Sequence, residues 1–316
     1  MKMKRCLRLI VSLLFVIPAS VCIRAQMPNL TPLPGTGQLT PPSDPDEFTF
    51  LVAGDNRPAH SGDPQPAIPG EIFDVAKAKN VSFVLWTGDT ISGKDPSDGA
   101  KIQAQYQEFL AIAAKARVPV YNAPGNHEMD DSNDVPNSQM LAWYIQYMGP
   151  QYGAVNIGNS RFIALNSEQT PPGPAPSGSG DKEPGYVDDA QFQLLEADLK
   201  ANEKMAHIFI FMHHPLEPYM KKDGFEAKNR KAMLKLLAKH HNVSFVFSGH
   251  EHMYFNPQSK HGLGQPGSRK DPSTPPTYIV TGGAGAPLKK APGGFYNYII
   301  MTVHKDKVSG ERFKVK

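Results

Sequence analysis

The chain has 316 residues, of which 40% are hydrophobic, 20% charged and 9% aromatic. These proportions are close to the average of soluble globular proteins, so they exclude a disordered chain, a coiled coil and a collagen. Lysine and arginine number 33 against 30 acidic residues, but five of these cations lie in residues 1–25, which contain no acid. The rest of the chain, with 28 cations and 30 anions, has no excess of positive charge to attract a nucleic acid.

Residues 1–25 have the pattern of a signal peptide. The basic segment Met1–Arg8 precedes the mostly apolar Leu9–Ile17, and Pro18 and small residues follow, so we predict cleavage after Ala25. The apolar stretch is shorter than the ~18 residues of a membrane span. A fraying N-terminal helix is the alternative. We therefore expect an exported protein, periplasmic or extracellular, without a transmembrane span.

The two cysteines of the chain, Cys6 and Cys22, both lie in this predicted leader. The mature chain would then contain no disulfide, no thiolate nucleophile and no thiolate metal ligand. A metal site in it would have to use nitrogen and oxygen ligands.

Residues 26–45 contain six prolines and little apolar periodicity. This composition predicts an extended linker outside the fold. Residues 46–316 are expected to form one domain, which two polar stretches rich in proline and glycine, 170–184 and 256–276, interrupt as long loops.

Five short apolar segments of this domain are predicted to be strands buried on both faces. They are Phe48–Ala53, Val81–Thr87, Val118–Ala123, Ile208–Met212 and Val243–Ser248. Stretches with helical periodicity, around Ile72, Tyr106, Leu195 and Met233, lie between several of them. Strands that alternate with helices indicate an α/β fold.

Further strands are predicted to add an antiparallel part to this fold. Residues 152–165 read as a hairpin that turns at Gly158-Asn159. Three more strand-like segments, 278–280, 297–303 and 311–315, occur near the C-terminus. The glycine-rich residues 280–288 lack the Lys-Ser/Thr of a phosphate loop, so a backbone turn near the rim of the site is the better interpretation.

Side chains that can bind metal follow the five buried strands. They occur in Gly54-Asp55-Asn56-Arg57, Gly88-Asp89, Gly125-Asn126-His127-Glu128, His213-His214-Pro215 and Gly249-His250-Glu251-His252. Each motif alone has a simpler explanation, because Gly-Asp after a strand is more often a turn or a helix cap. However, the ends of neighbouring strands share one rim of an α/β sheet. Without a cation, the carboxylates and imidazoles gathered there would be poorly solvated and would repel one another. The combination therefore predicts a metal site.

In this order, these motifs closely resemble those of the calcineurin-like metallophosphoesterases, over essentially all of residues 48–315. The resemblance implies a four-layer α/β/β/α sandwich, with two mixed β-sheets flanked by helices and a dinuclear metal centre at the C-terminal ends of the strands. It implies that Asp89 bridges both ions. The rest of the first shell would be Asp55 and His252, and the rest of the second would be Asn126, His213 and His250. His127 would not bind metal but would lie over the substrate and assist the leaving group.

The chemistry of such a centre explains these residue types. Two cations ~4 Å apart hold the attacking and the leaving oxygens of a phosphoryl displacement and lower the pKa of a shared water. The resemblance therefore implies hydrolysis of a phosphoester by in-line attack of a metal-bridging hydroxide. The imidazole-rich set favours Mn, Fe or Zn over Mg or Ca. Whether the substrate is a small molecule or a macromolecule, a monoester or a diester, is open, as is the oligomeric state.

The sequence departs from the family pattern at Arg57. Many relatives have a histidine ligand there, two residues after the first aspartate, and a guanidinium cannot bind a cation. Ser92 stands where another branch has a tyrosine ligand, so the first metal site looks under-coordinated. His60 would be a substitute, although its Gly/Pro-rich loop favours a solvent role. We expect Arg57 to grip a substrate phosphate, and the alternative is that it turns outward and pairs with Asp63.

Three functions compete on these observations. A metal-dependent phosphoesterase is favoured by His127, which metal binding alone does not require. A catalytically weak or silent module that binds metal or phosphate is favoured by the missing histidine ligand. A binding domain without metal leaves the side chains at the strand ends unexplained.

Overall fold

The computed structural model describes residues 26–93, 99–129, 137–170, 184–269, 274 and 276–315. The predicted leader with both cysteines and most of the loop 170–184 lie outside the described residues. Within the described ranges, no helix has both the length and the apolar character needed to cross a bilayer.

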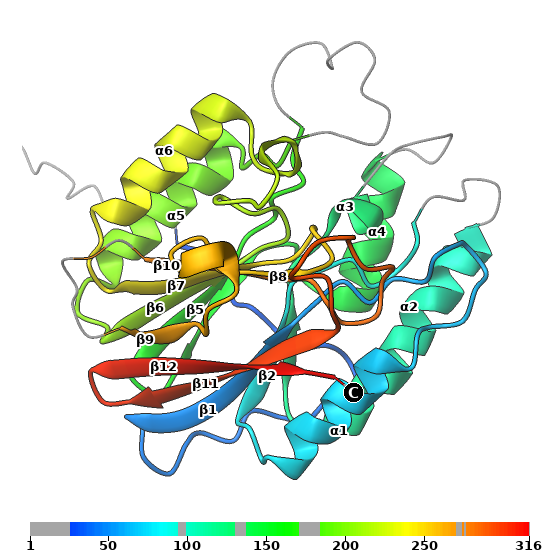
Figure 1. Cartoon of the computed structure of the whole chain (residues 1–316), viewed down its shortest axis with the longest axis horizontal. Coiled ribbons are helices and arrows are strands. Elements are labelled where there is room, and N and C mark those ends of the chain that lie inside the picture. The colour runs from blue at the N-terminus through cyan, green and yellow to red at the C-terminus, as the bar shows by residue number, and fades with distance from the viewer. Residues whose placement is uncertain are drawn as a thin grey trace, which may run out of the picture.

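Two mixed six-stranded sheets form the centre of the molecule (Figure 1). The first contains β1 (Glu47–Ala53), β2 (Phe83–Trp86), β3 (Val120–Asn122), β9 (Gly267–Arg269), β11 (Asn297–His304) and β12 (Lys307–Lys314), in the spatial order β3-β2-β1-β11-β12-β9. The second contains β4 (Gly153–Ile157), β5 (Ser160–Ala164), β6 (His207–Phe211), β7 (Val243–Ser248), β8 (Tyr254–Phe255) and β10 (Thr277–Thr281), in the order β4-β5-β6-β7-β10-β8. In the first sheet β1, β2 and β3 are parallel, and in the second β5, β6, β7 and β10 are parallel.

Helices cover the outer face of each sheet (Figure 1). The first sheet packs against α1 (Ile68–Ala78), α2 (Gly99–Ala113) and α4 (Asn137–Met148), and the second packs against α5 (Asp189–Ala201) and α6 (Ala227–Ala238). The one-turn helix α3 (Asn126–Met129) and the 3₁₀ turns η1 (Ala114–Ala116), η2 (Lys221–Asp223) and η3 (Lys260–Gly262) lie in connections. The predicted four-layer α/β/β/α sandwich is confirmed.

Because each sheet lies between helices and the other sheet, apolar and polar residues do not alternate along its strands. Along β1, Phe50 and Val52 point between the two sheets, whereas Leu51 and Ala53 point toward the helices. The space between the sheets is filled largely by phenylalanine rings: Phe50 stacks on Phe83 at 5.1 Å between centroids and meets Phe209 of the other sheet edge-on at 5.1 Å. Such edge-to-face pairs lock two sheets more specifically than aliphatic contacts do.

Most predicted elements are confirmed to within a few residues. The hairpin β4–β5 turns at Gly158, whose φ of 57° lies in the left-handed region that glycine adopts most easily. Asp188 caps α5, with its Oδ1 accepting a bond from the amide of Gln191 at 2.7 Å. The sequence interpretation missed α4, and it missed β9, whose Gly-Ser-Arg carries no strand signal and pairs only at the edge of β12.

Residues 26–45 are not the tether that the sequence suggested, because they pack against the domain. Met27, Leu30 and Leu33 are each at most 5% exposed. The Leu30 amide donates to the carbonyl of Ala154 at 3.0 Å, and the Leu33 amide donates to Val120 at 2.8 Å. An extended, proline-rich backbone therefore pairs with edges of the sheets. Single apolar residues between prolines have no periodicity, which is why their burial could not be recognised.

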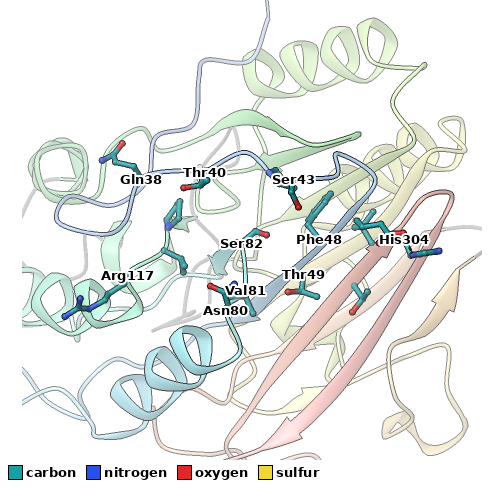
Figure 2. A pocket seen from close by; sticks show the side chains of 16 residues that line it. Gln38, Thr40, Ser43, Phe48, Thr49, Asn80, Val81, Ser82, Arg117 and His304 are labelled. Carbon is teal, nitrogen blue, oxygen red and sulfur yellow. Dashed lines mark ion pairs between the residues drawn. The ribbon is translucent and has the colours of Figure 1, made fainter.

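This segment also borders a cavity of about 660 Å³ (Figure 2). Figure 2 shows Gln38, Thr40 and Ser43 of the segment facing Asn80, Ser82, Arg117 and the start of β1. The cavity thus lies at the rim where β1 begins, and none of the residues predicted to bind metal lines it.

Candidate metal centre

The residues predicted to bind metal meet at the opposite rim, beyond the C-terminal ends of the parallel strands. Asp55 follows β1, Asp89 follows β2, Asn126 follows β3, His213 follows β6, and His250 and His252 follow β7. Asp55, Asp89, His250 and His252 have φ angles of 64°, 55°, 69° and 46°. Left-handed backbone costs a non-glycine residue ~1–3 kcal/mol and gathers at functional sites.

Asp89 lies at the centre of the group. Its Oδ1 is 3.3 Å from Nε2 of His213, and its Oδ2 is 3.9 Å from Nε2 of His252. The carboxylate is 1% exposed, and Oδ1 also accepts a bond from the His127 amide at 3.2 Å. The two oxygens therefore face two different sets of side chains.

The first set consists of Asp55, Asp89 and His252. One ligand atom of each lies within 4.8 Å of the other two, and Nε2 of His252 is 3.6 Å from Oδ1 of Asp55. Asp55 is fully buried, and its Oδ2 has no hydrogen-bond partner among the described residues. A buried carboxylate oxygen without a donor is costly unless a cation compensates it.

The second set consists of Asn126, His213 and His250. Oδ1 of Asn126 is 3.0 Å from Nε2 of His213 and 3.2 Å from Nδ1 of His250, and these two nitrogens are 3.2 Å apart. Three atoms that can each bind a cation therefore lie in one cluster, next to Oδ1 of Asp89.

Backbone carbonyls fix the tautomers of two of these imidazoles. Nδ1 of His213 is 2.8 Å from the carbonyl oxygen of Thr87, and Nδ1 of His252 is 2.8 Å from that of Pro287. Because a carbonyl only accepts, we assign the proton to Nδ1 in both rings, which leaves a lone pair on Nε2. Those lone pairs face carboxylate and amide oxygens, so the arrangement fits a cation and is unfavourable without one.

Burial and charge shape the titration of the group. Burial, and then the charge of Asp89, raise the pKa of Asp55 well above its usual value. Burial would also raise the pKa of Asp89, but the imidazoles of His213 and His127 hold it well below the usual range. Burial lowers the pKa of His213 and lowers that of His250 further. Burial thus favours the neutral form of both imidazoles, which is the form that binds metal.

Glycine introduces four of the five motifs, and at two of them a carboxylate packs against the glycine backbone. A Cβ at Gly249 would lie 2.1 Å from Oδ2 of Asp55, and a Cβ at Gly125 would lie 2.3 Å from Oδ1 of Asp89. Any side chain at these positions would displace a predicted ligand. The glycines therefore serve close approach in addition to turn geometry.

Glu128, which the sequence analysis included in the third motif without a role, links two of the motifs. Its Oε2 accepts bonds from the amides of Asp89 and Gly125 at 3.0 and 2.7 Å. Its Oε1 accepts from the amide and hydroxyl of Thr90, at 2.5 and 2.7 Å, and from the amide of Ile91 at 3.3 Å. Burial, and then the Asp89 charge, raise the pKa of Glu128 to about 7.

The glycine-rich residues 280–288 form the predicted turn and support the first set. The Ala286 amide donates to the carbonyl of Asp55 at 2.8 Å, and the Pro287 carbonyl holds His252.

Glu251, between the two histidines, accepts bonds from the amides of Tyr219 and Met220 at 2.7 and 2.8 Å. These partners are distant in sequence and carry no motif of their own.

Arg57 faces the site. Its Nε is 3.6 Å from Oδ2 of Asp89, with the side chain 18% exposed, while Asp63 accepts a bond from the His60 amide instead. The outward pairing of Arg57 with Asp63 is therefore not formed. His60 is exposed and is not part of the first set, so it does not replace the missing ligand.

The backbone carbonyl of Ser92 fixes the orientation of the His127 ring. Nδ1 of His127 bonds the carbonyl of Ser92, and its Nε2 is 3.9 Å from Oδ2 of Asp89. Ser92, at the position of the tyrosine ligand of another branch, thus orients His127 and offers no ligand atom to the first set.

Comparison with known sequences identifies relatives. The family model described as calcineurin-like phosphoesterase matches residues 48–254. The 3',5'-cyclic adenosine monophosphate phosphodiesterase CpdA of Pseudomonas aeruginosa is 25% identical over 181 residues, which are 56% of this chain and 57% of that protein.

Solved structures share the fold. The purple acid phosphatase PPD1 of yellow lupin (Lupinus luteus) superimposes with a TM-score of 0.62 at 17% identity, covering 90% of this chain and 53% of that one. A dimetal phosphatase of Danio rerio gives 0.58 at 16% identity, covering 85% and 97%. GAP50, the anchor in the inner membrane complex of Plasmodium, gives 0.52 at 13% identity, covering 85% and 84%. The chain thus spans little more than half of the Pseudomonas and lupin relatives.

Proposed function

This chain belongs to the calcineurin-like phosphoesterase family, and we propose that it hydrolyses a phosphoester with the help of two transition-metal ions. In this proposal Asp55, Asp89 and His252 hold the first ion. Asp89, Asn126, His213 and His250 hold the second.

The observation that carries the proposal is the arrangement around Asp89. Its two oxygens face two separate sets of ligand atoms, 3.3 Å from His213 on one side and 3.9 Å from His252 on the other. Both imidazoles present Nε2 lone pairs, because backbone carbonyls bind their Nδ1 protons. A single carboxylate shared between two such sets is suited to bridging two cations.

The ions would supply the charge that activates a water and stabilises the phosphoryl group in the transition state. The chain itself would then supply the proton for the leaving oxygen. Nδ1 of His127 is bound by the Ser92 carbonyl, so the proton to be given would be carried on Nε2, on the side of Asp89.

Arg57 is proposed to bind an oxygen pair of the substrate phosphate. Its Nε is buried without a hydrogen-bond partner among the described residues, although it is 3.6 Å from a carboxylate. A guanidinium beside a metal ion is favourable only when an anion lies between them, and arginine can bind two phosphate oxygens at once.

We expect Arg57→Ala to weaken competitive inhibition by inorganic phosphate about 10-fold or more, since one charge-assisted pair is worth ~1.5–3 kcal/mol. Binding of the second ion should be unchanged. Arg57→His should raise the affinity of the first ion, measured by calorimetric titration with Mn²⁺. Arg117→Ala, which removes an arginine at the opposite rim, is the control. Unchanged phosphate inhibition and unchanged first-ion affinity in the Arg57 variants would remove Arg57 from the site.

A catalytically silent module that binds metal or phosphate is the second candidate. It is favoured by Arg57, which leaves the first ion with three protein ligands instead of four in this proposal. The two candidates make different predictions for turnover but the same prediction for metal binding.

Removal of the metal by chelation, followed by assays of turnover, distinguishes the two candidate functions. Treatment of the purified protein with EDTA, followed by gel filtration, is expected to abolish hydrolysis of aryl phosphate mono- and diesters. Mn²⁺ or Zn²⁺ should restore more activity than Mg²⁺, because three imidazoles in the ligand set disfavour an ion that prefers oxygen. The cyclic-nucleotide relative makes a phosphodiester the first natural substrate class to assay. Activity that resists chelation, or that only Mg²⁺ restores, would contradict the metal assignment, and bound metal without turnover would favour the silent module.

Export is proposed from residues 1–25. Expression of the full chain in a bacterial host, fractionation of the periplasm and N-terminal sequencing should give a mature chain that begins at Gln26. A chain that retains its N-terminus in the cytoplasm would contradict export.

A further inference from the structure

The three histidines of the proposed metal centre are not oriented in the same way. His213 and His252 each bind a backbone carbonyl through Nδ1. Nδ1 of His250 instead contacts Oδ1 of Asn126 and Nε2 of His213, which belong to proposed ligands of the same ion. A metal-binding histidine almost always has an outer hydrogen bond that fixes its ring, and no backbone carbonyl among the described residues holds the His250 ring as one holds His213 and His252.

The ring of His250 instead stacks on that of His214. Their centroids are 3.9 Å apart and the planes differ by 32°, whereas the His213 ring meets both of them nearly edge-on. His214 is 2% exposed. Its Cβ also packs against Gly185, where an added Cβ would lie 2.5 Å from it. His214 is therefore enclosed and cannot move away from His250 without repacking.

Glu168 fixes the orientation of His214. Its Oε1 accepts a bond from Nδ1 of His214 at 2.8 Å and another from the hydroxyl of Ser167 at 2.5 Å. The Ser167 oxygen in turn accepts from the amides of His213 and His214 at 3.2 and 2.9 Å. The buried carboxylate thereby holds both the His214 ring and the peptide that carries His213.

We propose that His214, held by Glu168, is a positioning residue that orients His250 toward the second metal ion by ring stacking. The stack takes the place of the outer hydrogen bond that the other two imidazoles have. The inference rests on the proposed metal centre. A buried ion pair that serves stability alone is the simpler explanation, but such pairs add little net stability, and this one is in contact with a proposed ligand.

The test compares His214→Gln with His207→Ala. Glutamine keeps an N–H for Glu168 but has no ring, so it removes the stack alone. His207 is a second buried histidine of the same sheet, bonded to Ser244 and the carbonyl of Lys305 at the other end of β6, and it controls for the loss of a buried imidazole. The readouts are calorimetric titration of the EDTA-treated protein with Mn²⁺ and the visible absorption spectrum of its Co²⁺ form.

We expect His214→Gln to lower the affinity for the second ion about 10–100-fold, the usual effect of losing an outer-sphere contact. It should also shift the absorption bands of the Co²⁺ form. The first ion should be unaffected. Glu168→Gln, whose amide oxygen still accepts from His214, should retain most of the affinity, and His207→Ala should match wild type. If His214→Gln does not fold, His214→Ala with the same readouts replaces it.

Equal second-ion affinity and spectra in wild type and His214→Gln would overturn the inference while leaving the metal centre intact. Equal losses in His207→Ala and His214→Gln would also overturn it, because the effect would then be general destabilisation. A wild-type protein that binds no metal would overturn the proposed function itself, so the two failures are distinguishable.

Discussion

Asp89→Ala is expected to remove bound metal and phosphoester hydrolysis together. Among the described residues, Asp89 is the carboxylate whose two oxygens face both sets of ligand atoms, at 3.3 Å from His213 and 3.9 Å from His252. Its loss would leave imidazoles and one carboxylate that cannot hold two cations close together. Two-metal clamping stabilises a transition state by several kcal/mol, so turnover should fall by at least about 10³-fold. Metal content by plasma mass spectrometry and turnover of an aryl phosphodiester are the two measurements.

A matched control distinguishes loss of metal from loss of structure. Asp198 is as deeply buried as Asp89, but it lies on α5 and pairs with Arg161 of β5, outside both ligand sets. Asp198→Ala should lower thermal stability but retain metal. An Asp89→Ala protein that keeps two equivalents of metal would contradict the bridging role.

His127→Ala should behave differently, retaining both ions and losing turnover. Its ring bonds the Ser92 carbonyl, its Nε2 is 3.9 Å from Oδ2 of Asp89, and its side chain is in neither ligand set. If Nε2 gives a proton to the leaving oxygen, the loss should be about 10²–10⁴-fold. The loss should be smaller for a substrate with a good leaving group, such as a nitrophenyl ester, than for an alkyl ester.

The dependence of the loss on the leaving group tests whether His127 acts on the leaving oxygen. Equal losses for both esters would show that His127 does not act on the leaving oxygen. Metal loss equal to that of Asp89→Ala would make it a structural support of the centre instead.

Much of the fold followed from local patterns. The buried strands were recognisable because helices cover the outer face of each sheet, so that both faces of strands such as β1 are apolar. The site motifs were recognisable because polar residues that can bind metal come soon after each strand, and glycine introduces four of the five motifs. The parallel arrangement of β1, β2 and β3, and of β6 and β7, then brings their C-terminal ends to one rim.

The remaining features depend on contacts between distant segments. Glu128 accepts bonds from amides about 38 residues away, and the Pro287 carbonyl binds His252 from 35 residues away. No local sequence pattern indicates either contact. The amides of Leu30 and Leu33 pair with the carbonyls of Ala154 and Val120, and both residues are buried where this segment packs on the domain. Pairing of this kind is decided by the assembled surface, so a proline-rich segment was mistaken for a linker.

Crystals of the mature protein soaked in Mn²⁺, with anomalous diffraction recorded at the Mn edge, would test the central claim most directly. Two anomalous peaks ~4 Å apart are predicted on either side of the Asp89 carboxylate. One should lie between Asp55 and His252, and the other should lie among Asn126, His213 and His250. A single peak in the second set alone would mean that Arg57 has replaced the first ion. The account would be contradicted by the absence of any peak at this rim, or by peaks only at surface carboxylates.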